Sequence, residues 1–566
     1  MLSLQKFFLP IGLFLIILLT YWDLPKTFFQ QDEWESLAVS IYYQSKGWLG
    51  IVQSIFPPDA ISHFNPLARV YAWFTFWLFN TNFTPYAWLS IGMHTLNALL
   101  LYYFVNIRLN NRKIALISAL FFGVNSIPSQ AVTWVAAINS YEIPMALILL
   151  SLIFFHKLIT QKNNRRRNLI ASLIMLFLSL MFHENGMFLF FFYPATFFFI
   201  AKSEWKKLMQ TFLPGIIICL LAFAFIRIPF FFGLTTPLSN MTYISHPPIT
   251  VYPYRLISMG MKSFAASLVP EKTLIDISDK MVHLAYPQFL TLDKIPNPFI
   301  TQSIVLDLVS YLLTFLIVCL FILFIKVIRE KKVSEAFVWA LLFIPASLSP
   351  YVLVLGNAGY ASIIESKFFY IGSIGVSILI GIIVYSILLK FEGRKVLQIT
   401  VYLLFGLYLF SHVHAIKMNL NNLEEVSSIR KMLLMQVQSS YPDLPDKVVF
   451  FTKSDTAYYG MPSEEKILPL QIGFGRMLMV WYQRNERFPG CLYKGQFLLS
   501  PLAQEYRFCN GRGFGNFRNY DKLIASIQEF GIKPEEVIAY SWEGQKEKFI
   551  DITKEIRGKI KQDVER

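Results

Sequence analysis

The chain has 566 residues, of which 55% are hydrophobic and only 15% are charged. An average soluble domain carries about 25% charged residues, so a mainly soluble protein is excluded. The 54 Phe, 28 Tyr and 11 Trp beside only 4 Cys also exclude disordered, collagen-like and disulfide-scaffold proteins. What remains is a membrane protein with several spans. The formal net charge is +15. The location of the basic residues along the chain decides whether this charge indicates nucleic-acid binding or membrane topology.

Eleven apolar runs come close to the length that a membrane-crossing helix needs, which is about 20 apolar residues. They lie near residues 7–22, 85–106, 113–128, 141–157, 168–183, 185–201, 208–232, 302–325, 334–355, 368–389 and 396–415. The first run could also be a cleaved signal peptide, but Leu24-Pro25-Lys26 offers no small-x-small cleavage site. We therefore expect an uncleaved anchor and a polytopic α-helical membrane protein with about 11 transmembrane helices.

Basic residues favour one side of this predicted bundle. One alternating set of connections carries nineteen Lys and Arg in short loops, and the other set carries nine in longer segments. Since cytoplasmic loops retain positive charge, the first set is predicted to be cytoplasmic. We thus expect an integral protein of the cell membrane with a cytoplasmic N-terminus and an extracytoplasmic C-terminal tail. The positive net charge is then explained by the basic cytoplasmic loops, and we do not expect nucleic acid as a partner.

Three substantial outer segments follow from this topology: residues 23–84, residues 233–301 and the tail. Residues 1–416 are predicted to form the transmembrane domain. Within it, residues 233–301 contain prolines and many apolar residues, and they would form either a partly interfacial lid or a plain connecting loop. Residues 417–566 are predicted to form a soluble α/β domain, because about 150 residues can bury a core of their own.

The tail shows short strand-like and helix-like patterns. Strands are predicted at 448–452, 477–482 and 537–542, and helices at 419–438, 520–530 and 553–562. Cys491 and Cys509 could form a disulfide in an oxidising compartment, but two cysteines are too few to establish one. The run Gly511-Arg512-Gly513-Phe514-Gly515 lacks the ending of a phosphate-binding loop, so it is predicted to be a turn-rich loop.

Polar side chains gather at the outer ends of the predicted spans and in the outer loops. They are Asp32, Glu33, Glu35, His63, Asn65, Arg69, Asn139, Tyr141, Glu142, His183, Glu184, Glu365 and Lys367. A proton-coupled transporter usually carries ionisable groups near the middle of its spans. Only His94 is a candidate for that role, and a single buried histidine is more often a packing residue. The distribution therefore favours chemistry at the outer membrane surface.

The acidic pair Asp32-Glu33 directly follows the first span and is the strongest local signal. Adjacent carboxylates repel each other, so one can stay protonated or both can recruit a cation. Such a pair suits a general base that takes a proton from an attacking hydroxyl. The alternative is a solvated loop followed by the acidic first turn of a helix. Together with His63 and His183, the pair could also hold a divalent metal ion.

The acidic pair is the first of a series of short motifs along the chain. The others are HFNPL at 63–67, MHTLNALLLYY at 93–103, ALFFGVNSIP at 119–128, AVTWVA at 131–136, FHENG at 182–186 and KFFYIGS at 367–373. As an ordered set, these motifs resemble the GT-C superfamily of membrane glycosyltransferases. The resemblance is greatest to protein O-mannosyltransferases and to their multi-span relatives with tetratricopeptide repeats.

The resemblance covers residues 1 to about 415 and includes departures from the family pattern. His183 stands where the relatives have Lys, and Lys367 stands where they have Arg. Gly372 replaces a proline, and Ser366 replaces the glutamate that should directly precede the basic residue, so that Glu365 lies one place too early. The tetratricopeptide repeats are absent, and the tail resembles no family that we can name.

The resemblance implies transfer of a sugar from a polyprenyl-phosphate carrier to a protein or glycan acceptor on the outer membrane face, with inversion at the anomeric carbon. It implies that Asp32 and Glu33 are catalytic and that Lys367 and Arg69 bind the donor phosphate. The residues expected to bind substrate are His63, Asn65, Glu142, His183, Glu184, Glu365 and Tyr370. The family requires no cofactor and no metal ion. A flippase or transporter of lipid-linked saccharides and a non-catalytic membrane scaffold with an outer binding domain are the alternatives.

Overall fold

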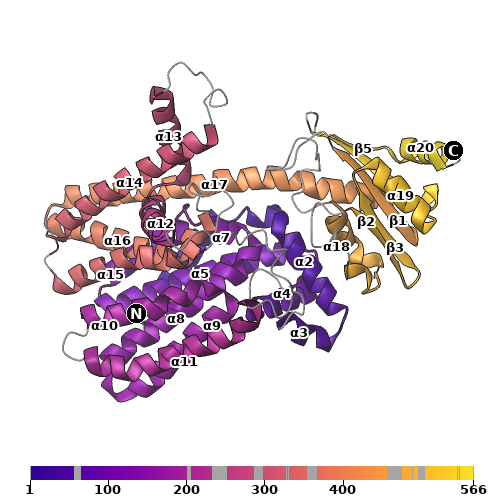
Figure 1. Ribbon diagram of the computed structural model, residues 1–566. Coiled ribbons are helices and arrows are strands. Elements are labelled where there is room, and N and C mark those ends of the chain that lie inside the picture. Colours follow the sequence, from indigo (N-terminus) through magenta and orange to yellow (C-terminus); the bar gives the residue numbers. More distant parts are fainter. Residues whose placement is uncertain are drawn as a thin grey trace. The chain divides into compact units, whose positions relative to one another are not determined.

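The computed structural model describes residues 2–55, 65–200, 205–231, 251–285, 298–326, 328, 330–353, 366–454, 474–486, 488–494, 504–544, 546 and 548–564. Helices make up most of the described residues, and among these residues strands occur only toward the C-terminus (Figure 1). The chain divides into two compact units. The first comprises Met1–Trp22, Pro57–Ala68 and Trp88–Asn419, and the second comprises Asp23–Phe56, Arg69–Ala87 and Leu420–Arg566.

Helices build the first unit. Those within it are α1 (Leu2–Thr20), α6 (Arg112–Val124), α7 (Gln130–Thr133), α8 (Ile143–Thr160), α9 (Arg165–Phe182), α10 (Leu189–Ile200), α11 (Trp205–Phe231), α12 (Val251–Leu268), α13 (Glu271–Ala285), α14 (Pro298–Ile325), α15 (Lys331–Leu348) and α16 (Phe369–Lys390). Both units share α4 (Pro66–Phe79), α5 (Phe83–Leu109) and α17 (Lys395–Ser440). Short helical turns include η2 (Val135–Ala137), η3 (Ile138–Glu142), η5 (Glu184–Phe188), η8 (Ser349–Leu353) and η9 (Ser366–Phe368).

Each of the predicted apolar runs coincides with a helix of the structure. Among the described residues, 6 helices are long and apolar enough to cross a membrane, namely Phe83–Leu109, Val135–Thr160, Ile304–Ile325, Lys331–Tyr351, Ser366–Lys390 and Lys395–Ser440. The helices α6 and α10 are shorter, with 13 and 12 residues. The chain is therefore an integral membrane protein of the polytopic helical class.

Glycines allow α16 to approach two neighbouring helices closely. A Cβ added at Gly375 would lie 2.7 Å from the carbonyl oxygen of Ala340 in α15. One added at Gly381 would lie 2.9 Å from the carbonyl oxygen of Ile114 in α6. Small residues at such contacts let membrane helices pack backbone to backbone. This packing fixes α16, and with it the turn η9 that carries Lys367.

The described residues of segment 233–301, which was predicted to lie outside, form α12, α13 and the start of α14 at Pro298. The first of them packs against α14, α15 and α16. Nζ of Lys262 in α12 lies 2.5 Å from Oδ1 of Asp307 in α14, and both side chains are largely buried. A plain connecting loop is therefore wrong for residues 251–285. Residues 232–250 and 286–297 lie outside the described part of the chain, and a lid function stays a prediction.

A five-stranded sheet forms the centre of the second unit, with strand order β2-β3-β1-β4-β5. The strands are β1 (Lys447–Ser454), β2 (Glu505–Cys509), β3 (Arg512–Phe517), β4 (Val537–Glu543) and β5 (Lys548–Asp551). The central strand β1 is parallel to β3 and β4, whereas the edge strands β2 and β5 pair antiparallel to their neighbours. The predicted C-terminal α/β fold is confirmed.

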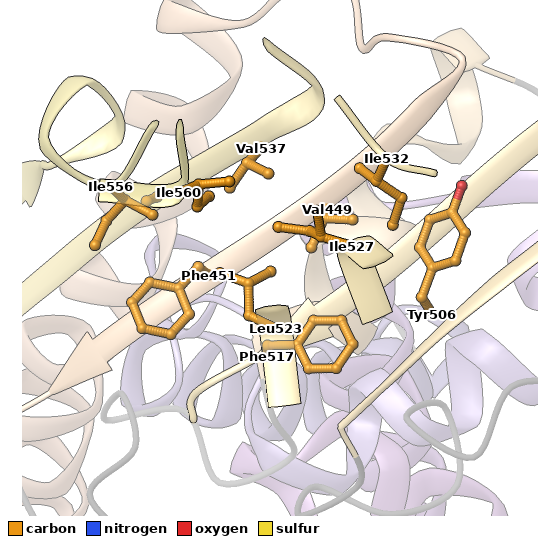
Figure 2. Close-up of a cluster of buried hydrophobic side chains, with 11 residues drawn as sticks. Val449, Phe451, Tyr506, Phe517, Leu523, Ile527, Ile532, Val537, Ile556 and Ile560 are labelled. Carbon is orange, nitrogen blue, oxygen red and sulfur yellow. The ribbon is translucent and has the colours of Figure 1, made fainter. Parts of the chain in front are cut away.

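Side chains of β1 alternate between the two faces of this sheet. On one face, a buried cluster includes side chains from α19 (Tyr520–Phe530) and α20 (Thr553–Val564), as Figure 2 shows. The cluster consists of Val449, Phe451, Tyr506, Phe517, Leu523, Ile527, Ile532, Val537, Ala539, Ile556 and Ile560. On the other face, Gly475 of α18 (Phe474–Glu486) lies against Asn516 of β3, where an added Cβ would be 2.4 Å from the Asn516 Cβ. The domain thus has helices on both faces of its sheet.

Two predictions for the tail are wrong. The apolar run 477–482 is part of helix α18 and not a strand, because a short buried run without alternation fits either element. The glycine-rich run at 511–515 begins as a turn but continues as strand β3. Its turn is the Asn510-Gly511 pair, with φ values of 50° and 79°, which suit a tight hairpin between β2 and β3. The other strands and helices predicted for the tail are confirmed.

Two further helices of the second unit come from the segment that follows α1. They are α2 (Gln31–Gln44) and α3 (Trp48–Ile55). Helix α2 packs against α18 of the tail, and the two helices lie side by side in Figure 1. A disulfide joins Cys491 to Cys509, so the bond that two cysteines alone could not establish is present in the structure.

Candidate functional site

Lys367 lies in the turn η9, directly before α16. Its Nζ atom is 3.9 Å from the centroid of the Trp134 ring, and its backbone N–H donates to Oε1 of Gln130 at 3.3 Å. Ser366 Oγ donates to the carbonyl oxygen of Ile127. These bonds tie η9 to the segment around α7 and hold the ammonium group against an aromatic face. Such a cation–π contact contributes about 0.5–2 kcal/mol, depending on desolvation.

A row of aromatic rings leads from Lys367 to His183. The ring of Phe368 lies 6.1 Å from that of Tyr141, which lies 5.7 Å from the imidazole of His183. Nδ1 of His183 is 3.5 Å from Oε2 of Glu184. We name the set of Trp134, Tyr141, His183, Glu184, Lys367 and Phe368 the Lys367 cluster. It brings together three residues that the sequence predicts to contact substrate or phosphate, namely Lys367, His183 and Glu184.

The polar members of the Lys367 cluster are partly accessible. The side chains of His183 and Glu184 keep 15% and 14% of their exposure, and Lys367 is half-buried. Nδ1 of His183 and Oε2 of Glu184 are themselves buried, so the exposed part of each side chain lies on its other atoms. The cluster offers one cation, one carboxylate, one imidazole and several ring faces, which suits a ligand that is anionic at one end and rich in hydroxyl groups at the other.

Glu142 and Tyr370 lie deeper, in a buried hydrogen-bond network. Nδ2 of Asn97 donates both to the backbone carbonyl of Glu142 at 2.9 Å and to Oη of Tyr370 at 3.1 Å. Oγ of Ser90 lies 3.2 Å from Oε1 of Glu142, and Nδ1 of His94 lies 2.8 Å from Oη of Tyr370. Both predicted residues are 0% exposed. The structure joins them through Asn97, in a position that supports the packing of the helices.

His94 is confirmed as a packing residue. Its second ring nitrogen, Nε2, lies 3.2 Å from the carbonyl oxygen of Gly123, so both nitrogens have partners inside the first unit. Its ring also lies 5.0 Å from that of Phe122 and 5.5 Å from that of Tyr21. The histidine therefore connects α5, α6, α16 and Tyr21, the residue that follows α1.

Asp32 and Glu33 lie in the first turn of α2, in the second unit. The side chain of Gln30 accepts a hydrogen bond from the backbone N–H of Glu33, and Oε2 of Glu33 accepts one from the backbone N–H of Gln30. This reciprocal pair is a capping box, which stabilises the start of a helix. The backbone of both residues thus forms the acidic first turn of a helix, but the Glu33 side chain is 2% exposed and not solvated. A catalytic role of Glu33 stays a prediction. Asp32 as the general base stays a prediction.

Arg69 lies in α4 and also belongs to the second unit. Burial lowers the pKa of its guanidinium, and the charge interaction and hydrogen bond with Tyr43 oppose that shift. An arginine starts from a pKa above 12, so Arg69 keeps its positive charge near neutral pH. Lys367 belongs to the first unit, and a shared role of the two residues in phosphate binding stays a prediction.

The remaining predicted residues give less information. His63 and Glu365 lie outside the described residues, and Asn65 directly precedes α4. Within the described residues, no group of three or more His, Cys, Asp or Glu side chains could hold a metal ion. The proposed metal set with Asp32, Glu33 and His183 includes His63 and therefore stays a prediction.

Sequence reasoning missed three residues that organise the site: Trp134, Gln130 and Asn97. The first lies inside the motif at 131–136, and the third lies inside the motif at 93–103. For Trp134 and Asn97, the position inside a motif was a signal that the residue matters. The role of each of the three residues could not be predicted, because each contacts a residue that is far away in the sequence.

The fold and the site define an integral membrane protein with a helical membrane unit and a C-terminal α/β domain. No protein-family model and no curated protein matches the chain. Solved structures similar to it include two crystal structures of ArnT from Cupriavidus metallidurans, one bound to undecaprenyl phosphate and one in the apo state. Both are 12% identical; the first covers 95% of this chain and 93% of ArnT with a TM-score of 0.42, and the second covers 96% and 93% with a TM-score of 0.40. A likeness at this level assigns no activity and no residue role.

Proposed function

We propose that the chain is a membrane glycosyltransferase of the GT-C type. It would move a sugar from a polyprenyl-phosphate donor to a hydroxyl of a protein or glycan acceptor, with inversion of the anomeric carbon. The observation that carries the proposal is the Lys367 cluster, in which a cation at the start of an apolar helix is followed by aromatic rings, an imidazole and a carboxylate.

Lys367 is the proposed partner of the donor phosphate. Lysine binds phosphate as a point charge, and the first turn of α16 adds the partial positive charge of a helix N-terminus. As the bond between the anomeric carbon and the phosphate oxygen breaks, negative charge grows on the phosphate. A fixed ammonium then stabilises the transition state more than the ground state.

The other polar members of the cluster would orient the sugar. His183 and Glu184 can donate and accept hydrogen bonds to sugar hydroxyls, and the ring of Tyr141 provides an apolar face beside them. Glu142 and Tyr370 would support this arrangement from within the helix bundle, because both are buried in the network of Asn97.

Asp32 is the proposed general base. An acceptor hydroxyl attacks the anomeric carbon, and its proton passes to the carboxylate of Asp32 while the polyprenyl phosphate leaves. One bond forms and one breaks on opposite sides of the same carbon, so the configuration inverts. The step requires no cofactor and no metal ion.

The reaction would take place on the outer membrane face, with the N-terminus in the cytoplasm. The partition of Lys and Arg among the connections supports this orientation. The disulfide between Cys491 and Cys509 supports it as well, because disulfides form and persist in oxidising compartments outside the cytosol. The C-terminal domain would therefore be extracytoplasmic.

The proposal can be tested with purified protein in lipid nanodiscs, a panel of polyprenyl-phosphate-linked sugars, and protein and glycan acceptors that supply the attacking hydroxyl. Mass spectrometry should detect release of free polyprenyl phosphate by the wild type and a strong loss of release for Asp32→Asn. Asp23→Asn, in the same segment, is the matched control and should behave as the wild type. Movement of the intact lipid-linked sugar across a vesicle membrane, with no phosphate released, would identify a flippase instead.

A further inference from the structure

Arg476 of α18 is a buried cation in the C-terminal domain. It is 1% exposed, and its Nη1 atom lies 3.2 Å from Oε2 of Glu35 in α2. A guanidinium removed from water requires a charged or hydrogen-bonding partner nearby. The Glu35 side chain is 46% exposed. Within this ion pair the arginine is therefore buried, whereas the glutamate remains in contact with solvent. The pair links the tail to the segment that follows the first span.

Glu35 comes three residues after Asp32 in the same helix. Residues at this spacing are neighbours on one side of an α-helix. The capping box of Gln30 and Glu33 makes the first turn of α2 regular. A contact that holds Glu35 therefore also restrains the backbone position of Asp32.

Other contacts inside the second unit hold the same segment. The ring of Phe28 lies 6.0 Å from that of Trp481 in α18 and 5.7 Å from that of Trp34 in α2. At the other end of α2, an added Cβ at Gly490 would lie 2.9 Å from Oγ of Ser45. The C-terminal domain thus contacts α2 and its flanks at both ends, with Arg476 contacting its first turns.

We infer that Arg476 is a positioning residue, which fixes the first turn of α2 and thereby the placement of Asp32. The C-terminal α/β domain is then a working part of the transferase and not only an appended binding module. This inference rests on the proposed function, because it gives Asp32 the role of the base.

The test uses the full chain in nanodiscs and compares Arg476→Met, Arg476→Lys and Glu35→Gln with the wild type. Arg512→Met is the matched control, because Arg512 forms an exposed ion pair with Asp446 in the same domain, at 2.9 Å. Two quantities are measured: hydrogen exchange of the amides in residues 28–36, and the kcat and KM for release of polyprenyl phosphate.

Arg476→Met and Glu35→Gln should speed exchange in residues 28–36 and lower kcat by about 10-fold or more, with the donor KM within about 2-fold. Arg476→Lys should restore part of both, since it keeps the charge but not the fork of donors. The combined charge exchange, Arg476→Glu with Glu35→Arg, should recover activity relative to either single variant. A purely structural role would lower the folded fraction and leave the kcat per folded enzyme unchanged, so kcat is counted per folded protein.

Two results would overturn the inference. One is wild-type exchange in residues 28–36 for both Arg476→Met and Glu35→Gln. The other is faster exchange with unchanged kcat in an enzyme that Asp32→Asn inactivates, which would leave the proposed function standing. If Arg476→Met fails to fold, Glu35→Gln decides the question, because it leaves the buried arginine in place. If the wild type releases no polyprenyl phosphate from any donor, the proposed function itself fails, and the positioning role falls with it.

Discussion

The ammonium group of Lys367 lies 3.9 Å from the centre of the Trp134 ring. A ring face attracts a cation without cancelling its charge, so this contact helps to hold the lysine in place. The backbone of Lys367 is also bonded to Gln130 at 3.3 Å. The segment around α7 therefore positions the only residue of the Lys367 cluster that is suited to bind a phosphate.

Removal of the Lys367 charge should slow the reaction. Lys367→Met keeps much of the apolar stem and is expected to lower turnover at least ~10-fold, equivalent to ~1.4 kcal/mol, and to weaken binding of the polyprenyl-phosphate donor. Lys367→Arg should retain part of the activity, because a guanidinium also binds phosphate. The measurements are phosphate release and lipid binding in nanodiscs. Wild-type rate and affinity in Lys367→Met would show that the lysine is only an anchor at the membrane interface.

Loss of the ring beneath Lys367 should have a smaller effect. Trp134→Leu removes a cation–π contact of about 0.5–2 kcal/mol, so we expect weaker binding of the polyprenyl-phosphate donor than in the wild type. Trp134→Phe keeps a ring and should fall between the two. Binding isotherms for the three proteins test this order. Equal affinity for all three would show that the ring does not position the ammonium for the lipid phosphate.

Replacement of the proposed base should affect chemistry more than binding. Positioned proton transfer typically contributes 10²- to 10⁴-fold, so Asp32→Asn should lower turnover by about that factor. Donor binding should persist, because the substitution conserves shape. Single-turnover kinetics with a separate binding assay distinguish the two effects. A folded Asp32→Asn protein with full activity would refute the assignment.

The orientation of the chain can be read by cysteine labelling of intact cells. Cys219 and Cys319 are the free cysteines and are replaced first, while the disulfide is kept. Ala525 in α19 and Asn164 between α8 and α9 are both exposed. A membrane-impermeant reagent should label a cysteine at position 525 and not one at position 164. The reverse pattern would overturn the orientation and the proposal of an outer site.

The disulfide should stabilise the C-terminal domain. It closes a segment of 18 residues, and a loop of that size corresponds to about 3 kcal/mol in the chain-entropy account. The double variant Cys491→Ser with Cys509→Ser should therefore unfold at a lower temperature than the wild type. Reducing agent should lower the Tm of the wild type and leave that of the variant unchanged. Equal melting with and without reductant in both proteins would contradict a stabilising bond.

The sequence alone predicted the helices of the membrane part. Each apolar run became a helix, because the length and apolarity that a bilayer requires are properties of a continuous segment. The fold class of the tail and the strands at β1 and β4 were also predicted. The site residues Lys367, His183 and Glu184 could be named in advance, since their motifs lie at the ends of predicted spans.

The tertiary structure decided which of these residues meet. Residues 477–482 were predicted as a strand and are part of helix α18, because a short apolar run fits either element and its packing decides between them. Trp134 under Lys367, the burial of Glu142 and the link from Arg476 to Glu35 were not predictable from any local pattern. Each of them joins segments far apart in the chain, and such contacts depend on how whole helices pack, because short-range preferences do not specify the distance between remote side chains.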